Sequence, residues 1–457
     1  MTNNTNNIED ELIVTIEKLA SNAQGIARVN GITVFVDGVC PEDICKIKII
    51  KKNKSYYIAK LLEIITPSKH RVKPFCPMYN VCGSCQLQHI DYNSQLKFKR
   101  EIVEDLMKGL SVCVQDVEPS PQITEFRHKI QYPIRQTSVS KRILAGYFKP
   151  KSHDLVNIKY CPIQPSICDE IIDFIRNSAQ KHNISGYDEK THKGLLRHVV
   201  IRASAENNNQ LVVLVVNDNK ISQRLKDFCL SIYEKFSSVT GVLVNFNTKK
   251  TNLIMTENTK SVVGSEYINE VLCNTTFKIG ANTFFQVNPK SADNIFKYVK
   301  QYIIDNFKEP VILDAYAGIS AFGLTLADIS KKVVSVEECK ASVELAKEIK
   351  TENSITNIEI NHADCSKFFE KEIKNNKKGY DITILDPPRK GCSKESLDYS
   401  LLLTKSKILY ISCNPATLAR DLKYLTEKGA KVLSLKPFDM FCHSHHVETV
   451  AIISVDN

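Results

Sequence analysis

Four of the fifteen cysteines in this 457-residue chain have a spacing that could hold a metal centre. Cys76, Cys82 and Cys85 form a C-x5-C-x2-C motif, and Cys161 follows at a distance, between a tyrosine and a proline. Four thiolates can bind a [4Fe–4S] cluster or a tetrahedral zinc ion. Zinc sites more often use two C-x2–4-C pairs, and only one pair here has that spacing. The pattern therefore favours the cluster, with zinc and four unrelated thiols as the alternatives.

A second set of reactive residues lies near the C-terminus. Cys413 follows the β-rich run 407–412 and precedes Asn-Pro, which ends the strand and can start a helix whose N–H groups favour a thiolate. Asp386 ends the preceding run and is fixed by two prolines. Glu448 begins an apolar run, where burial would raise its pKa and make it a proton acceptor. The nearby histidines 443, 445 and 446 could bind a metal, but we interpret them as a polar loop.

The elements that must position these residues alternate regularly from residue 311 onward. Strand-like runs at 311–315, 332–337, 357–361, 381–385, 407–412, 431–435 and 447–455 are separated by helical runs. This alternation predicts a doubly wound parallel sheet with an antiparallel edge near its end. Ligands of such sheets bind at the carboxyl ends of the strands, where Asp386 and Cys413 stand.

The same strand ends suggest a nucleoside cofactor. Asp314 is followed by a turn of small residues, and Glu337 ends the next strand, where a carboxylate can accept hydrogen bonds from ribose hydroxyls. The turn is not a G-x-G-x-x-G pyrophosphate loop, so S-adenosylmethionine fits better than a dinucleotide. Asp364, after the third strand, could reach an adenine amino group, or it could be a helix cap.

The N-terminal third has a different character. Short β-rich runs between residues 12 and 65 predict a small barrel. Residues 46–73 hold nine lysines or arginines and a single acid, a net charge of +8 that contributes most of the excess of +10 in the whole chain. Tyr56 and Tyr57 lie beside these lysines, a combination suited to single-stranded nucleic acid, although lysines also protect edge strands.

Composition excludes several classes of protein. Apolar residues make up 43% of the chain and charged residues 25%, values of a folded globular protein rather than a disordered one. The start of the sequence, residues 1–7, has neither a charged nor an apolar segment, and no apolar run reaches the roughly 20 residues of a membrane span. We therefore expect a cytoplasmic protein without a membrane partner, in which clustered cysteines are not disulfides. A monomer is the default expectation.

Taken together, these motifs resemble the RNA (uracil-5-)-methyltransferase family, specifically its 23S ribosomal RNA branch with a TRAM domain and a [4Fe–4S] cluster. The resemblance covers nearly the whole chain. It depends on the four cysteines and on five ordered motifs: Phe126-Arg127-His128-Lys129, Phe284-Phe285-Gln286-Val287-Asn288, Asp386-Pro387-Pro388-Arg389, Ser412-Cys413-Asn414-Pro415 and His446-Val447-Glu448-Thr449. One departure is that Ser320 and Ala321 stand where family members often have a second glycine and a polar residue.

The resemblance implies a domain organisation. It places an OB-like TRAM RNA-binding barrel at residues 8–66 and an α+β middle domain with the iron–sulfur cysteines at 67–282, whose helical segment at about 92–118 could pack on the catalytic domain. A Rossmann-like methyltransferase domain follows at 283–457.

The resemblance also implies roles. Cys413 would be the nucleophile, Glu448 the base and Asp386 a catalytic group. Contacts to the cofactor or to the target uracil would come from Gln286, Tyr316, Glu337, Asp364 and Asp386. The cluster ligands would be Cys76, Cys82, Cys85 and Cys161. The expected reaction is methyl transfer from S-adenosylmethionine to C5 of a uridine in ribosomal RNA.

Four alternatives remain open at the level of sequence. A transfer-RNA uracil methyltransferase would share the catalytic motifs. A cytosine-5-methyltransferase often has a second cysteine in the Asp-Pro-Pro loop, where Arg389 stands here. A radical methylthiotransferase with a TRAM domain needs C-x3-C-x2-C. A non-catalytic RNA-binding assembly factor would not need both Cys413 and Glu448.

Overall fold

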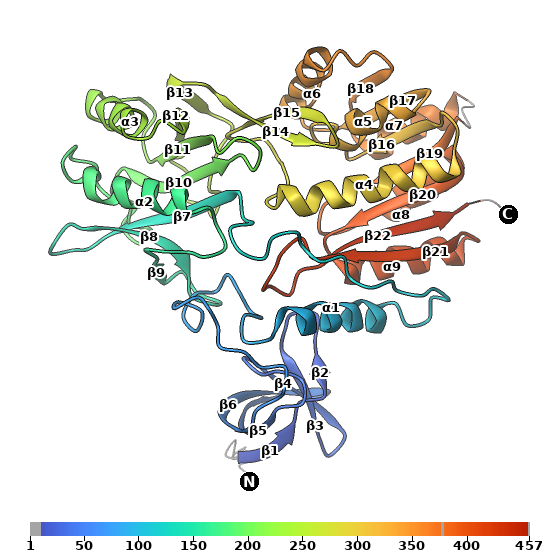
Figure 1. Cartoon of the computed structure of the whole chain (residues 1–457), viewed down its shortest axis with the longest axis horizontal. Coiled ribbons are helices and arrows are strands. Elements are labelled where there is room, and N and C mark those ends of the chain that lie inside the picture. Colours follow the sequence, from blue (N-terminus) through green and yellow to red (C-terminus); the bar gives the residue numbers. More distant parts are fainter. Residues whose placement is uncertain (1–10, 376–378, 456–457) are drawn as a thin grey trace, which may run out of the picture.

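The N-terminal part of the molecule is a small β domain. The computed structural model describes residues 11–375 and 379–455, so residues 8–10, 376–378 and 456–457 of the predicted domains lie outside the described residues. Six strands are ordered β1-β5-β6-β4-β3-β2, and only β4 and β6 pair in parallel (Figure 1). Their bounds are β1 (Glu11–Thr15), β2 (Lys18–Leu19), β3 (Gly25–Val29), β4 (Ile32–Val36), β5 (Ile44–Lys52) and β6 (Tyr56–Thr66). Along β5, Cys45, Ile47 and Ile49 are buried, while Lys51 and Lys52 at its end are exposed.

A single long helix, α1 (Tyr92–Leu106), lies between this domain and the C-terminal part (Figure 1). Phe98 and Ile102 pack with Leu19 and Cys40 of the β domain, while Val103 packs into the core of the C-terminal sheet. The helical segment expected at about 92–118 ends at Leu106. Beyond it the chain turns at Gly109, whose φ is 95°, and residues 114–118 run parallel to the late strand β21 (Lys431–Phe438).

The middle of the chain forms a seven-stranded sheet in the order β13-β12-β11-β10-β7-β8-β9. Its elements are β7 (Lys129–Gln136), β8 (Ile143–Phe148), β9 (Leu155–Asn157), α2 (Ser166–Ala179), β10 (Leu196–Ala203), β11 (Gln210–Val216), α3 (Gln223–Lys235), β12 (Val239–Phe246) and β13 (Thr259–Gly264). Both faces are covered, since Val212 and Leu214 of β11 pack with α2 and α3, while Val213 and Val215 pack on the opposite side. The continuous apolar run of β11 reflects this two-sided burial.

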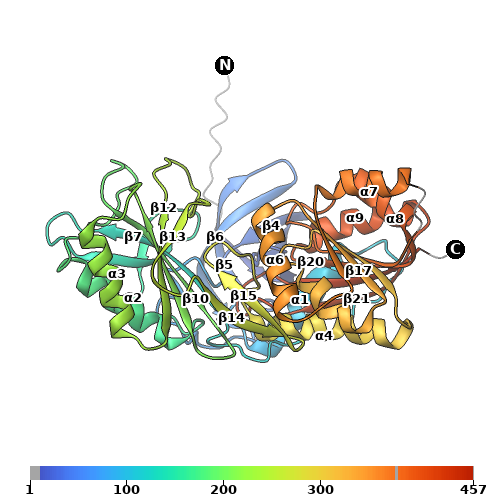
Figure 2. The ribbon, with the colours of Figure 1, turned by 90° about the horizontal axis from the view of Figure 1, so that it is seen from above.

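A hairpin and a helix join the middle sheet to the C-terminal part. They are β14 (Tyr267–Leu272), β15 (Thr275–Gly280) and α4 (Pro289–Asn306). One core holds Val213 of the middle sheet, Phe277 of the hairpin, Ile295 of α4 and Ile312 of the C-terminal sheet. The core is therefore continuous across residue 282, where the sequence suggested a domain boundary, and the two α/β parts lie side by side (Figure 2).

The C-terminal sheet has seven strands in the order β18-β17-β16-β19-β20-β22-β21. Its elements are β16 (Val311–Ala315), α5 (Ala321–Leu326), η1 (Ala327–Ile329), β17 (Lys332–Glu337), α6 (Lys340–Glu352), β18 (Ile358–His362), α7 (Cys365–Lys374), β19 (Tyr380–Leu385), α8 (Lys394–Leu403), β20 (Thr404–Ser412), α9 (Pro415–Glu427), β21 and β22 (Glu448–Ser454). Alternate residues such as Ile312 and Leu313 enter different cores on the two faces, one with α4, α5 and α6 and the other with α1, α7, α8 and α9. This confirms the predicted doubly wound methyltransferase-like fold.

One detail of the sheet differs from the expectation. The antiparallel strand is β22, and it is inserted between β20 and β21 instead of forming the edge. The strand at this edge of the sheet is β21, and β18 lies at the opposite edge. In the part of the chain that the structure describes, no helix is both long and apolar enough to cross a membrane.

Candidate active site

The carboxyl ends of β16 and β17 form the first part of the candidate site. Asp314, near the end of β16, is buried and accepts hydrogen bonds from the backbone N–H of Gly323 (2.9 Å) and the hydroxyl of Ser335 (3.1 Å). Burial raises the pKa of its carboxyl to about 7, against the opposing effect of these hydrogen bonds. Asp314 therefore holds the start of α5 against β17 and fixes the turn between them.

The turn itself has the shape that a nucleoside cofactor needs. Tyr316 and Ser320 adopt left-handed backbone conformations, with φ of 58° and 59°, and Gly318 does so with φ of 56°. Glu337, at the end of β17, accepts hydrogen bonds from the backbone N–H groups of Gly318 (2.9 Å) and Cys339 (2.8 Å). Its carboxylate is thereby aimed along the strand ends, where ribose hydroxyls bind in sheets of this type.

Asp364 lies further out on the same edge. It is exposed and caps α7 by accepting a hydrogen bond from the backbone N–H of Lys367 (3.0 Å). The helix-cap interpretation is therefore correct for this residue. This bond uses one of the acceptor sites of the carboxylate, so others are available to a ligand.

Asp386, Cys413 and Glu448 meet at the same edge of the sheet. Asp386 directly follows β19 and Cys413 directly follows β20, its parallel neighbour. Glu448 begins β22, and the pairing of Ser412 with Thr449 places it beside Cys413. Three residues from distant parts of the sequence are thus brought to one point by sheet register alone.

The electrostatics of this group favour protonated side chains at neutral pH. Burial, and then the neighbouring Asp386, raise the pKa of Glu448 to about 8, while Arg389 opposes the shift. Burial and the nearby Asp314 raise the pKa of Asp386 to about 7. The expectation of a raised pKa for Glu448 is confirmed.

Cys413 behaves differently from the expectation. Its pKa is raised to about 11, chiefly by burial and then by Glu448 and Asp386, while Arg389 opposes the shift. The thiol form is therefore the resting form of this side chain at neutral pH. The thiol must lose its proton as it reacts.

Arg389 also belongs to this site, although its motif does not by itself indicate a role for it. Its positive charge lowers the pKa of Cys413 and that of Glu448. The backbone carbonyl of Arg389 accepts hydrogen bonds from the side chains of Asn414 (3.1 Å) and Thr417 (3.3 Å), which tie its loop to the start of α9. Its position within Asp-Pro-Pro-Arg was the available signal.

Gln286 lines a neighbouring cavity. The loop that carries it is tied to β7, since the backbone N–H of His128 donates to the carbonyl of Val287 (2.7 Å). His128, Lys129, Arg202 and Gln286 are among the residues that line the cavity. Burial, with the adjacent Arg202 and Arg127, lowers the pKa of Lys129 to about 7. Glu270 also lines this cavity, so it holds both a carboxyl group and basic side chains.

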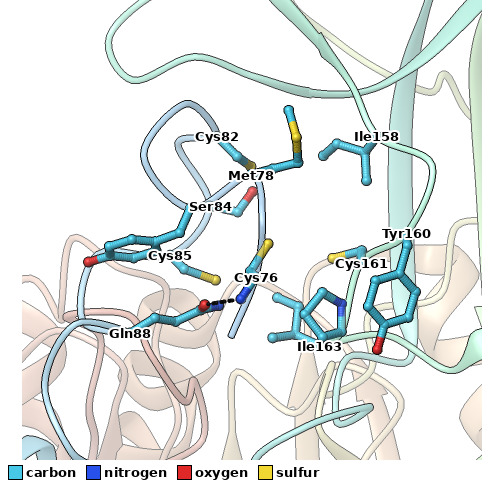
Figure 3. A pocket seen from close by; sticks show the side chains of 12 residues that line it. Cys76, Met78, Cys82, Ser84, Cys85, Gln88, Ile158, Tyr160, Cys161 and Ile163 are labelled. Atoms are coloured by element: carbon cyan, nitrogen blue, oxygen red, sulfur yellow. Dashed lines mark hydrogen bonds between the residues drawn. The ribbon is translucent and has the colours of Figure 1, made fainter. Parts of the chain in front are cut away.

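The four predicted metal-ligating cysteines surround a second cavity (Figure 3). Cys76, Cys82 and Cys85 come from the loop before α1, and Cys161 comes from the segment before α2. Apolar side chains, among them Met78, Ile158 and Ile163, form much of the remaining wall. Among residues 11–375 and 379–455, no three His, Cys, Asp or Glu side chains form a ready metal site. The thiols therefore share one space without being drawn together around a common point.

Local contacts hold the two cysteine segments in place. The backbone N–H of Gly83 donates to the carbonyl of Phe148 (3.0 Å), and a side chain at this position would collide with that strand end. The backbone N–H of Cys161 donates to the buried carboxyl of Asp169 (3.0 Å). A bulky apolar-walled cavity with four thiols and fixed backbones fits a [4Fe–4S] cluster by its donor set.

Comparison with known proteins decides the family. Residues 91–455 match the family described as tRNA (Uracil-5-)-methyltransferase, and residues 9–62 match the TRAM domain. The chain belongs to the tRNA (Uracil-5-)-methyltransferase family. It is an S-adenosylmethionine-dependent RNA methyltransferase with an N-terminal TRAM domain, as the sequence motifs predicted.

Two relatives support this at full length. An uncharacterized RNA methyltransferase of Clostridium tetani is 36% identical over 442 residues, which cover 96% of this chain and 95% of the relative. One from Bacillus cereus is also 36% identical, over 445 residues and 96% of each chain. The structure of Pyrococcus abyssi tRNA (uracil-54, C5)-methyltransferase in complex with S-adenosyl-L-homocysteine is similar with a TM-score of 0.78 at 26% identity, covering 97% of this chain and all of that one.

Proposed function

We propose that this methyltransferase modifies C5 of uridine in 23S ribosomal RNA. The proposed reaction at uridine is supported chiefly by one observation. Asp386, Cys413 and Glu448 lie together at one edge of the sheet. The preference for ribosomal RNA is supported by the resemblance of the TRAM and cysteine segments to the ribosomal branch. Transfer RNA is the second candidate, because the family description and the Pyrococcus abyssi enzyme both name it.

Cys413 starts the proposed reaction. Uracil C5 is a weak carbon nucleophile, so the sulfur of Cys413 adds to C6, and the electron pair of the C5–C6 double bond moves toward the O4 carbonyl. S-adenosylmethionine supplies an electrophilic methyl group when it is bound. The enolate carbon C5 takes that methyl group. The electrons of the broken methyl–sulfur bond would remain on the sulfur of the cofactor, which is released as S-adenosylhomocysteine. Because the pKa of Cys413 is near 11, its proton must pass to a neighbouring carboxylate or to water during addition.

Glu448 completes the reaction. After methyl transfer, C5 carries both a methyl group and a hydrogen. The carboxylate of Glu448 removes that proton, the freed electron pair restores the C5–C6 double bond, and the sulfur of Cys413 leaves C6. Asp386, beside both residues, would hold the uracil ring by hydrogen bonding while charge develops on it.

The cofactor contacts are proposed on the same edge. Glu337 is placed to accept hydrogen bonds from ribose, and Tyr316 begins the turn that the nucleoside approaches. Gln286 and Asp386 would contact the cofactor or the uracil, and Asp364 is the outermost candidate for adenine. The geometry of the turn around Asp314 supports this assignment, since its small residues let a ligand approach the backbone.

RNA would reach the site across basic surfaces. C5 and C6 of a base are inaccessible inside a helix, so the target uridine must be unpaired or flipped out. The exposed Lys51 and Lys52 at the end of β5 and the half-buried Arg127 and Lys129 would hold the surrounding backbone. Phe284, next to Gln286 in the chain, is 67% exposed and offers a ring for stacking.

We further propose that Cys76, Cys82, Cys85 and Cys161 hold a [4Fe–4S] cluster. No step of the proposed reaction needs an electron, so its role would be structural. Iron and acid-labile sulfide should be present in anaerobically purified protein and should fall in Cys161→Ser but not in Cys113→Ser, a variant of an exposed cysteine. Zinc without iron would instead support the zinc alternative.

The deciding experiment is methyl transfer from labelled S-adenosylmethionine to unmodified ribosomal RNA and transfer RNA, followed by digestion to nucleosides. Anaerobically purified wild type should form 5-methyluridine in ribosomal RNA, and Cys413→Ala should form none. Product in transfer RNA alone would overturn the ribosomal assignment. Binding to both RNAs without methylation would favour a non-catalytic assembly factor.

A further inference from the structure

The segment 439–447, between β21 and β22, ends at the proposed base. Glu448 is the next residue, and the segment closes the β21–β22 hairpin whose end pair is Phe438 and Glu448. The packing of this segment therefore supports the position that strand pairing gives the carboxylate. The segment is short and irregular, and its residues are buried except for Phe441, His445 and His446, which are half-buried. Its turn is made by His443, a non-glycine residue with φ of 61°. Such a conformation persists only where the surroundings impose it.

Helix α1 makes the strongest contact with this segment. The ammonium of Lys99 and the carboxylate of Asp439 form an ion pair of 2.5 Å in which both side chains are 0% exposed. The same ammonium donates to the backbone carbonyl of Phe441 (3.1 Å). Two charges without access to water are costly to separate, so this pair fixes Asp439 and the start of the segment against α1.

Three parts of the chain, one of them α1 itself, hold His443. Gln95, one turn before Lys99 on α1, accepts from its backbone N–H and contacts its Nδ1, both at 3.2 Å. The backbone N–H groups of Gln86 and Leu87 donate to its carbonyl at 2.8 and 2.9 Å. Its Nε2 lies 2.8 Å from the carbonyl of Ile123. Every polar atom of this strained residue is thus engaged, and Gln86 directly follows Cys85 of the cysteine cavity.

We propose that Lys99 is a positioning residue for proton removal, which acts by fixing segment 439–447 and hence the carboxylate of Glu448. This inference rests on the proposed function. Lys99 does not touch the reacting atoms, and the charges that act on Glu448 are those of Asp386 and Arg389. Cys413 and Asp386 directly follow β20 and β19, whose strand pairings include no residue of this segment. Loss of Lys99 should therefore impair the last step and spare the first.

The proposed reaction separates these steps. Cys413 addition joins protein and RNA covalently, and only proton removal at C5 lets the sulfur leave. In single-turnover reactions with S-adenosylmethionine and unmodified ribosomal RNA, Lys99→Met should release the adduct about 10- to 100-fold more slowly, because a displacement near 1 Å has costs of this size. The adduct should form at the wild-type rate to within about twofold. A denaturing gel measures both rates.

Matched variants keep the test sharp. Lys97→Met removes an exposed lysine from the same helix and should behave like wild type. Lys99→Arg keeps the charge and should recover part of the release rate. If Lys99→Met does not fold, Gln95→Leu, which frees His443 while keeping the ion pair, must show the same slow release. Equal slowing of formation and release, or release at the wild-type rate in the folded variant, would overturn the inference.

The outcome can be separated from failure of the proposed function. Glu448→Gln should accumulate the same methylated adduct. If Glu448→Gln accumulates adduct and neither Lys99→Met nor Gln95→Leu does, the positioning role is wrong and the mechanism stands. If Glu448→Gln releases product normally, or Cys413→Ala still methylates, the mechanism itself is wrong.

Discussion

At the scale of single residues, the site is governed by which carboxyl group is ionised. Glu448 can accept a proton only as a carboxylate, and its pKa is near 8. Release of the methylated product should therefore fall about tenfold per pH unit below pH 8 and level off above it. Arg389 lowers this pKa, so Arg389→Gln should move the profile to higher pH. Single-turnover release rates across the pH range measure this, with Lys390→Gln as the control; an unmoved profile would contradict the role of Arg389.

The same pKa predicts a cost in stability. An unfolded Glu448 ionises near pH 4.5, whereas the folded one stays protonated until about pH 8. Ionisation therefore favours the unfolded chain, and the folded state loses free energy as pH rises through this window. Glu448→Gln has no such loss and should exceed wild type in unfolding free energy by on the order of 2–4 kcal/mol at pH 8, with a much smaller gain at pH 5. Denaturant titrations measure this; Glu63→Gln, at an exposed position, should show no trend.

At the scale of elements, the sequence predicts the strands of the sheet and the residues at their ends, but it does not predict the contacts between distant segments. Asp386 and Cys413 were placed correctly at neighbouring strand ends because parallel strands bring their carboxyl ends together by rule. Lys99 and Asp439 are 340 positions apart, and an isolated lysine on an amphipathic helix carries no sign of a buried partner. The sequence likewise does not predict the raised pKa of Cys413, because this pKa depends on burial and on Glu448, which is distant in the sequence.

The turn between β16 and α5 leads to a further prediction. A methyl group at Gly323 would lie 2.4 Å from the hydroxyl oxygen of Ser335 and 2.9 Å from the carboxylate of Asp314. Gly323→Ala must therefore displace the network that shapes the cofactor turn, at a cost of about 1–3 kcal/mol in unfolding free energy. Affinity for S-adenosylhomocysteine, measured by calorimetry, should fall about tenfold. Gly379→Ala, where the added methyl meets open space, is the control, and equal affinity in both variants would contradict the network's role.

At the scale of the whole molecule, one helix contacts three separate parts of the protein. Helix α1 packs on the β domain through Phe98, enters the C-terminal core through Val103 and holds segment 439–447 through Lys99. The cysteine loop reaches the same segment through Gln86 and Leu87. The proposed RNA-binding domain, the cysteine cavity and the proton acceptor are thus connected by packed contacts rather than by flexible linkers.

The charge of the β domain supports a last prediction about how RNA is held. Lys51, Lys52 and Lys54 stand together at the turn between β5 and β6 and are all exposed. If they neutralise phosphates, binding must release counterions, and each lost contact lowers the dependence of log affinity on log salt by about 0.7 for single strands. Changing all three to Gln should reduce that slope by about 2, as measured with ribosomal RNA fragments over a range of salt concentrations.

The matched control changes three exposed lysines around α2 and α3, far from the β domain (Figure 1). Lys181, Lys226 and Lys235 carry the same total charge, so a change to Gln alters the net charge of the protein equally. If only the change of Lys51, Lys52 and Lys54 lowers the dependence of log affinity on log salt, the RNA runs along the β5–β6 hairpin. Equal slopes in the two triple variants would mean that these lysines act only through the net charge of the protein and do not contact RNA phosphates. The strand order already places β5 and β6 inside the sheet, so the edge-strand interpretation of these lysines is not supported.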